Sequence, residues 1–129
     1  MSLGLGDNIT EVPVFTQIKC LADVEYVSSG EDYCFAIEAV KEKVSNGSND
    51  VNYVWSFGNN THGTLGYPGN YSTPQRVDFF NEIKIVQIFC GPEICIFRSI
   101  EGNLYMTGTY TVSILYFYYY YDFFYFILY

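Results

Sequence analysis

Four cysteines and one histidine are the side chains of this chain that could most readily bind a metal or act as nucleophiles. The cysteines stand at positions 20, 34, 90 and 95, none of them in a C-x-x-C pair, and His62 is the single histidine. Structural zinc sites take four such ligands, commonly in closely spaced pairs. We therefore expect no metal site and no cofactor. Cys34 and Cys95 stand in apolar runs, which favours buried thiols that pack as small hydrophobic side chains over nucleophiles.

The remaining chemical motifs are weak. His62 has no Ser, Cys or carboxylate partner at a recognisable motif spacing, which favours a turn position over a catalytic base. Gly4-Leu-Gly6 and Gly66-Tyr-Pro-Gly69 resemble phosphate-binding glycines, but no strand-to-helix context and no G-K-[ST] follows them. Because no paired acids and no nucleophile–base set emerge, we expect a protein that is not an enzyme.

An acidic group surrounds one expected strand. Its members are Asp23, Glu25, Glu31 and Asp32. A solvated rim and a docking patch for a basic partner are both open interpretations. The whole chain has 14 acidic and 6 basic residues, a formal net charge of −8. Binding to phosphate backbones rests on Lys and Arg, so we expect no direct contact with nucleic acid and favour a protein partner.

The composition favours a small all-β chain. A length of 129 residues provides room for one small domain or for part of a larger one. Half of the residues are apolar and 16% are charged, which argues against disorder. The 14 Tyr and 11 Phe favour strands. Met1 is followed by neither a basic start nor an apolar core, so we expect an intracellular protein, cytoplasmic or nuclear, with reduced thiols.

The chain matches itself when it is shifted by 61 residues. The matching pairs include Pro13 and Pro74, Gly30 and Gly91, and Cys34 and Cys95. Gly58 matches Gly108 with a shift of 50, because the first copy carries an insertion within residues 39–52. We expect this polar insertion to form a loop with room for a helical turn. The underlying unit of about fifty residues lies in the range of propeller blades.

Each copy consists of short runs rich in Val, Ile, Tyr and Phe, bounded by Gly, Asn, Pro or Asp, as is typical of strands. The runs 33–37 and 94–97 are almost entirely apolar, which predicts strands covered on both faces. Gly30 and Gly91 follow strands. At such positions a turn with positive φ, or close packing, leaves no room for a Cβ atom.

The run Val54-Trp-Ser-Phe-Gly-Asn-Asn-Thr-His-Gly-Thr-Leu-Gly66 resembles the signature of regulator of chromosome condensation repeats. That signature runs aromatic-x-aromatic-Gly-x-Asn-x-x-Gly-Gln-Leu-Gly. A Pro-x-x-Val element follows, here Pro74-Gln-Arg-Val77, and then a Gly-x-x-His strand, matched around Cys34 and Cys95. The residues that carry the resemblance are Trp55, Phe57, Gly58, Asn60, Gly63, Leu65, Gly66, Pro74, Gly30, Gly91 and Gly108.

The resemblance implies a fold. Members of this family form seven-bladed propellers with four-stranded antiparallel blades. We accordingly expect an all-β partial propeller of about two blades, with repeat units at 3–58 and 65–110 in a domain spanning 1–110. Trp55, Phe57 and Leu65 would fill the space between sheets, and Asn60 would bond the backbone of the turn that follows it.

This chain also departs from the family pattern. Tyr33 and Ile94 stand where the family has His, Thr64 replaces Gln, and Thr107 replaces the second aromatic. Both ends look cut, because Met1 falls inside a Gly-Gln-Leu-Gly element and the family match stops near residue 110.

Residues 111–129 lie outside the repeat. They are dominated by Tyr, Phe, Ile and Leu, with Asp122 as the only charged residue. Three hypotheses are open: a membrane segment, a strand-forming adhesive terminus, and translated non-coding sequence from an A/T-rich genome. The abundance of Tyr and the lack of flanking Lys or Arg speak against the first, and low charge with high β-propensity suits the second. The third is favoured, because Tyr, Phe, Ile and Leu codons dominate A/T-rich sequence, and it is compatible with the second.

The resemblance implies a non-catalytic protein-interaction module that is a fragment of a propeller regulator. Family activities range from guanine-nucleotide exchange on a Ran-type GTPase, through chromatin docking, to substrate recognition in ubiquitin ligases. The expected partner is therefore a small GTPase, a basic protein or a ligase substrate. The alternatives are a membrane-tethered repeat protein anchored by residues 114–128, and a truncated gene product without independent function.

Overall fold

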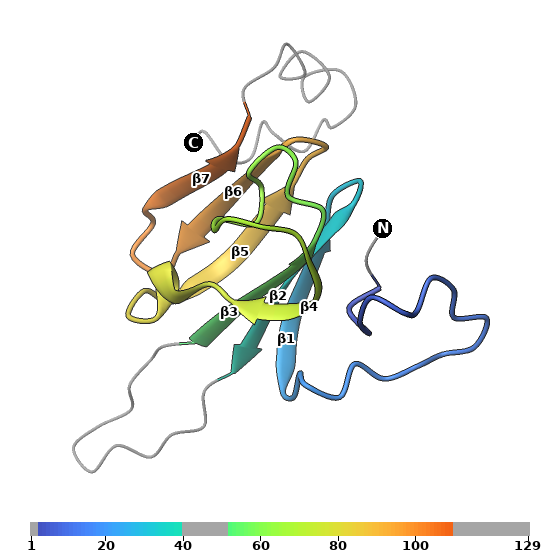
Figure 1. Cartoon of the computed structure of the whole chain (residues 1–129). Coiled ribbons are helices and arrows are strands. Elements are labelled where there is room, and N and C mark those ends of the chain that lie inside the picture. The colour runs from blue at the N-terminus through green and yellow to red at the C-terminus, as the bar shows by residue number, and fades with distance from the viewer. Residues whose placement is uncertain (1–2, 40–51, 110–129) are drawn as a thin grey trace, which may run out of the picture.

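Two antiparallel β-sheets make up the folded part of the chain (Figure 1). The computed structural model describes residues 3–39 and 52–109. The first sheet has the order β1-β2-β3-β4, with β1 at Val24–Ser29, β2 at Tyr33–Ala39, β3 at Asn52–Gly58 and β4 at Tyr71–Arg76. The second has the order β5-β6-β7, with β5 at Ile85–Cys90, β6 at Ile94–Ser99 and β7 at Leu104–Gly108.

The expected all-β class is confirmed, since one short 3-10 helix, η1 at Asp78–Phe80, is the only helical element of the described residues. The second sheet has three strands within those residues, where four were expected. The expected loop insertion falls between β2 and β3, and its residues 40–51 lie outside the described part of the chain, as does the tail from 110 onward.

The strands follow the spacing of the internal repeat. β5 and β6 begin 61 residues after β1 and β2, and β7 ends 50 residues after β3. The pairing repeats as well. The register of β1 on β2 shifts between Val24 and Tyr26, and that of β5 on β6 shifts between Ile85 and Gln87, again 61 residues later. The two copies therefore share even their β-bulges, which bend a strand at a defined place.

The boundaries of the sheets do not coincide with the boundaries of the sequence units, so sheet and unit are out of phase. β4 lies within the unit expected at 65–110, yet it pairs with β3 of the other unit. Pro74 is buried in β4, at the edge of the sheet, where a residue without an N–H group does not interrupt a ladder. Its counterpart Pro13 is exposed in the N-terminal segment 3–23, which contains no strand.

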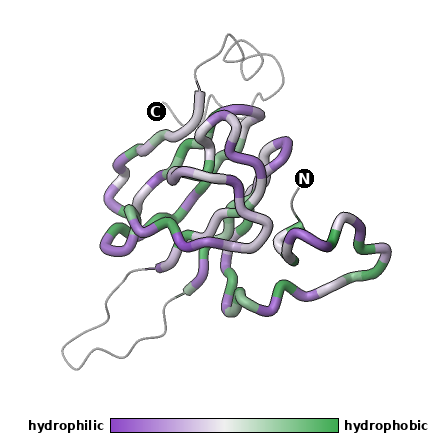
Figure 2. Tube along the Cα trace, viewed as in Figure 1, coloured by the Kyte–Doolittle hydropathy of each residue, from purple (hydrophilic) through white to green (hydrophobic). Residues whose placement is uncertain are grey.

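The core lies between the two sheets. Tyr33, Phe35 and Ile37 alternate along β2 and face Ile88 and Phe97 of the second sheet. The rings of Phe35 and Phe97 meet edge to face, with centroids 5.1 Å apart. Figure 2 shows hydrophobic stretches along the strands and hydrophilic residues in most of the loops that join them. Each such buried side chain contributes roughly 1.5–3 kcal/mol to stability.

The N-terminal segment packs on part of the outer face of the first sheet, near the ends of β3 and β4. A Cβ atom on Gly4 would lie 2.9 Å from the ring of Phe57, and Gly6 N donates a hydrogen bond to Ser72 O at 3.1 Å. Trp55 Nε1 donates to Glu38 at 2.7 Å on the same face. Successive side chains of a strand point to opposite faces. Trp55 and Phe57 therefore lie away from the core between the described sheets, contrary to expectation.

Tyr33 connects the turns of the two sheets. Its hydroxyl donates to the backbone oxygen of Gly91 and lies 3.3 Å from Ile94 O. Its ring lies against Gly30, where an added Cβ atom would be 2.3 Å from the ring and 2.6 Å from Gly91 O. The sequence left two reasons for glycine at position 30, a turn with positive φ or close packing. In the structure the reason is close packing.

The substitution Gly30→Ala should destabilise the fold by about 1–3 kcal/mol, because the added methyl group overpacks the contact between the two turns. The measurement is the free energy of unfolding from urea denaturation. Ser29→Ala, at the exposed neighbouring residue, is the matched control and should change stability by less than about 0.5 kcal/mol. Equal stabilities of the two variants would contradict the packing argument.

Candidate protein-binding rim

Three connections meet at one edge of the two sheets, at the top of Figure 1. They are the β1–β2 turn at 30–32, the β3–β4 loop at 59–70 and the β5–β6 turn at 91–93. We call this edge the turn rim. Loops carried by a rigid sheet scaffold are where binding residues usually lie.

Both ends of the turn rim are anchored in the same way. Asn59 N donates to Asp32 O, and Thr109 N donates to Glu93 O, each at 2.9 Å. The glycine before each donor has a positive φ, 120° at Gly58 and 117° at Gly108. A Cβ atom on either glycine would lie within 2.4 Å of the acceptor oxygen. Glycine is therefore required at both positions, by conformation and by space.

Asn60 organises the β3–β4 loop. Its Oδ1 accepts a hydrogen bond from Leu65 N at 2.8 Å, and its Nδ2 donates to Tyr67 O. Gly63, with φ 69°, closes the tight turn by donating to Asn60 O at 3.0 Å. Leu65 is fully buried in the core between the sheets. One amide side chain thus fixes the path of a loop that has no strand partners over this stretch.

The same loop crosses to the second sheet. Thr107 Oγ1 donates to Gly63 O at 2.7 Å, and Thr109 Oγ1 donates to His62 O at 2.9 Å. His62 Nε2 lies 3.7 Å from a carboxylate oxygen of Glu93. Thr107 stands where the family signature has an aromatic residue. Its hydroxyl forms the hydrogen bond to Gly63 that an aromatic ring could not form. Gly66, also at a positive φ, follows the crossing.

The structure divides the predicted acidic group. Glu31 and Asp32 are exposed on the turn rim, whereas Asp23 and Glu25 are exposed at the other end of β1. Four strand residues, 26–29, lie between Glu25 and the turn, which separates the pairs by more than roughly 13 Å. Glu93 joins the first pair on the rim. We did not single it out from the sequence, although the repeat offered a signal, because Glu93 stands 61 residues after Asp32.

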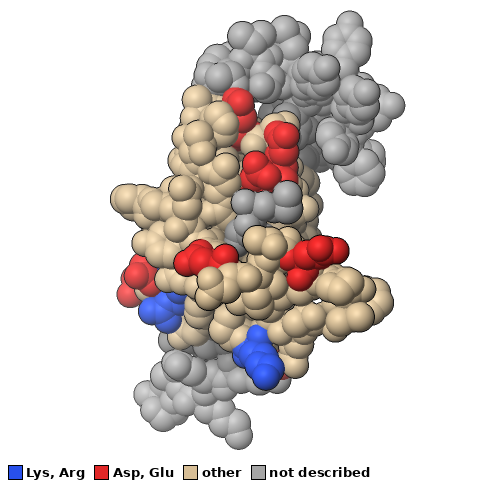
Figure 3. All heavy atoms as spheres, turned by 45° about the vertical axis from the view of Figure 1, so that its right-hand side comes forward, with Lys and Arg blue, Asp and Glu red and all other residues tan. Residues whose placement is uncertain are grey.

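Charge is unevenly spread over the face shown in Figure 3. Acidic side chains are visible near the turn rim at the top, whereas basic ones are visible only in the lower part. The three stretches that form the rim contain no Lys or Arg. The rim is therefore suited to a positively charged surface.

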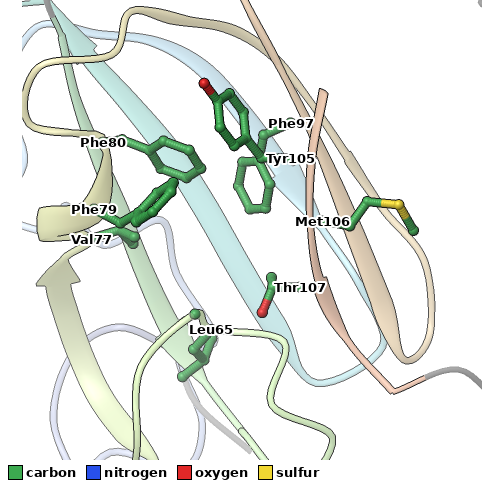
Figure 4. Close-up of a pocket in the computed structure, with 9 residues that line it drawn as sticks. Leu65, Val77, Phe79, Phe80, Phe97, Tyr105, Met106 and Thr107 are labelled. Atoms are coloured by element: carbon green, nitrogen blue, oxygen red, sulfur yellow. The ribbon is translucent and has the colours of Figure 1, made fainter. Parts of the chain in front are cut away.

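A pocket of about 230 Å³ lies between η1 and β7 (Figure 4). Phe79 and Phe80 face Phe97 and Tyr105 across it, while Met106 points away. The rings of Phe80 and Tyr105 meet edge to face at 5.5 Å. The lining of the pocket is apolar and aromatic, and the phenol of Tyr105 is the only titratable group in it. Such walls suit an apolar side chain and provide no acid–base pair for chemistry.

Three thiols gather where the two sheets meet. Cys95 is fully buried, its Sγ 3.2 Å from the Tyr33 hydroxyl and 3.5 Å from Cys90 Sγ. Cys34 and Cys90 are half-buried, and Cys20 is exposed. Burial raises the pKa of Cys95 and of Tyr33, whereas the hydrogen bond from Cys95 lowers the pKa of Cys90.

Neither a metal cluster nor a membrane-spanning helix is found in residues 3–39 and 52–109. Within them, no group of three or more His, Cys, Asp or Glu side chains could hold a metal ion. No helix in this part of the chain has the length and apolarity needed to cross a bilayer.

Asn60→Ala should lower the free energy of unfolding by about 1–3 kcal/mol, because it leaves the half-buried loop without its internal hydrogen bonds. Urea denaturation measures the change. Asn59→Ala is the matched control, because the Asn59 side chain bonds only to the exposed Thr61 beside it. A loss at Asn59 as large as the loss at Asn60 would show that loop position, rather than these bonds, sets the cost.

Stability should fall as pH rises from about 9, the ordinary pKa of a thiol. In the folded chain Cys95 and Tyr33 stay protonated at a pH where the unfolded chain ionises, so the unfolded state binds fewer protons and gains stability. Denaturation curves at several alkaline pH values measure the slope. Cys95→Ser should flatten it, and a slope identical to that of the unmodified chain would contradict this origin.

Part of the chain matches a known family of sequence repeats. A family model described as Regulator of chromosome condensation (RCC1) repeat matches residues 52–97. The match begins at the start of β3 and ends within β6, and so crosses from one sheet to the other. The search of curated proteins gives no match.

The solved structures that resemble this fold include two of yeast proteins. One is Prp20p from Saccharomyces cerevisiae, in a study of its binding to Gsp1p and histones, with 26% identity and a TM-score of 0.53. The other is yeast RCC1 (Prp20) with Kap60 bound, with 26% identity and a TM-score of 0.52. Each alignment covers 67% of this chain and 18% of the solved chain. Residues 52–97 thus match the RCC1 repeat, and the two sheets of the chain resemble blades of an RCC1 propeller.

Proposed function

We propose that this chain is a non-catalytic protein-interaction module whose turn rim binds a basic protein, with histones as the favoured partner class. The observation that carries the proposal is the rim itself. Exposed Glu31 and Asp32 lie beside Glu93 on an edge whose three connections contain neither Lys nor Arg. Such an edge attracts a positively charged surface and repels a negatively charged one.

The similarity to Prp20p supports the same partner class. That protein was studied for its binding to histones and to Gsp1p. Histones are strongly basic, so of these two partners they fit the acidic rim more directly. This chain spans 18% of the Prp20p chain, and the proposal therefore concerns binding by these blades alone.

A small GTPase of the Gsp1p kind is the second candidate. The similarity to Prp20p favours it, and the pocket between η1 and β7 provides an apolar recess that a side chain of such a partner can enter. Guanine-nucleotide exchange and ubiquitin-ligase substrate recognition are narrower possibilities, and no contact or charge pattern in the described residues favours either.

Charge reversal on the turn rim tests the proposal. Glu31→Lys combined with Asp32→Lys should weaken binding of core histones about tenfold at moderate salt, because two attractive charges become repulsive. Binding is measured by titration with purified histones, and the loss should shrink as salt rises.

The matched control carries the same charge change elsewhere. Glu82→Lys combined with Glu101→Lys alters two exposed carboxylates at the opposite end of the sheets. It should leave histone affinity within about twofold of the original. If both double variants lose affinity equally, net charge rather than the rim governs binding. If a Gsp1p-type GTPase binds and histones do not, the second candidate replaces the first.

A further inference from the structure

Cys90 and Cys95 stand directly opposite each other at the end of the β5–β6 hairpin. The next pair toward the turn, Gly91 and Ile94, is hydrogen-bonded, with Gly91 N donating to Ile94 O at 2.8 Å. Hydrogen-bonded and non-hydrogen-bonded pairs alternate along an antiparallel ladder, so the two cysteines form a non-hydrogen-bonded pair. Cα atoms of such pairs lie about 4.5 Å apart, within the range of about 4.4–6.8 Å that a disulfide spans.

The side chains are already on the same side of the hairpin. Cys95 Sγ lies 3.5 Å from Cys90 Sγ, so rotation of the two side chains, without a change of strand register, brings the sulfurs to bonding distance. The first hairpin has the same geometry but a different pair, Ser29 opposite Cys34. Two opposed thiols are therefore particular to the second hairpin and are no consequence of the repeat.

We propose that Cys90 and Cys95 are a modification site, a dithiol that a hydroperoxide oxidises to a reversible intramolecular disulfide. In the first step the Cys90 thiolate attacks one oxygen of hydrogen peroxide. The S–O bond forms, the O–O bond breaks, and the second oxygen leaves as hydroxide, which is protonated to water. In the second step the sulfur of Cys95 attacks the Cys90 sulfenic acid, forming the S–S bond as water leaves. Two thiols and one peroxide thus become one disulfide and two waters.

The surroundings assign the two roles. Cys90 is half-buried and accepts the hydrogen bond from Cys95, which favours its thiolate and makes it the attacking sulfur. Cys95 is fully buried and protonated, so it reacts only with a sulfur already beside it. For Cys34, burial, followed by the charge of nearby Cys90, raises the pKa, which disfavours it as the first nucleophile.

Oxidation of Cys90 and Cys95 also affects the contact that Tyr33 makes between the two sheets. The Cys95 thiol lies 3.2 Å from the hydroxyl of Tyr33, the residue that joins the two hairpin turns. A disulfide removes the single S–H hydrogen of Cys95, for which Cys90 Sγ and the Tyr33 hydroxyl are the two acceptors within reach. The redox state of the pair is thereby coupled to the hydrogen bonding of Tyr33.

Peptide mapping tests the proposal on the full chain. Trypsin cleaves after Lys84 and Arg98, which releases the peptide 85–98 with both cysteines and no other. After brief treatment of the folded chain with hydrogen peroxide, followed by thiol alkylation, this peptide should be lighter by two hydrogen atoms and carry no label. Dithiothreitol should restore two labelled thiols. The disulfide should form at least about tenfold faster than oxidation of exposed Cys20, because only the pair has a resolving thiol.

Cys90→Ser is the informative variant. It reproduces the Ser29–Cys34 arrangement that the first hairpin already accommodates, so the fold should be retained, as circular dichroism can verify. In this variant Cys95 should stay reduced under the same treatment, and in Cys34→Ser the disulfide should still form. The proposal is overturned if peptide 85–98 keeps two labelled thiols while Cys20 is oxidised, or if Cys90 joins Cys34 instead.

Discussion

The contact of Tyr33 with the opposite hairpin turn is the constraint on which the arrangement of the two sheets depends. Its hydroxyl bonds the backbone of Gly91, and its ring occupies the space that Gly30 leaves open. The buried aromatic side chains of the core extend from this point, beginning with the edge contact of Tyr33 and Phe35 at 6.1 Å. Hydrophobic burial holds the two sheets together, but because it is non-directional it does not fix how one sheet is placed on the other. The hydroxyl bond and the glycine contact fix where one turn meets the other, and hence the position of the rim.

Segments from outside each three-strand core of the repeat pack against the ends of β3 and β7. The β3–β4 loop reaches β7 through Gly63 and Thr107, and the N-terminal segment reaches β3 through Gly4 and Phe57. Both contacts end on the penultimate residue of a strand, but they use different glycines, since Gly4 corresponds in the repeat to Gly66 rather than to Gly63. Close packing requires glycine at position 4, where a Cβ atom would lie 2.9 Å from the Phe57 ring, whereas at Gly63 a Cβ atom would meet nothing within 4 Å and the positive φ of 69° is the reason for glycine.

Sequence reasoning predicted the all-β class, the repeat and its 61-residue spacing, because strand composition and turn glycines are local signals that occur twice. It could not assign β4 to the first sheet, since pairing partners are set by tertiary contacts that no single unit contains. Trp55 and Phe57 were expected between the sheets, yet strand alternation turns them to the other face. The 61-residue repeat could have identified Glu93 from Asp32, whereas the Cys90–Cys95 pair became visible only once the β5–β6 register was known.

The phase difference between sheet and sequence unit has an evolutionary consequence. Duplication of a complete unit would supply the last strand of an existing sheet together with the first strands of a new one. Each added copy would therefore be hydrogen-bonded to its predecessor from the moment it folded. A gene that grows in this way gains blades already attached to the array, and a recombination break between 58 and 71 would leave one edge of β3 open to pairing with another chain.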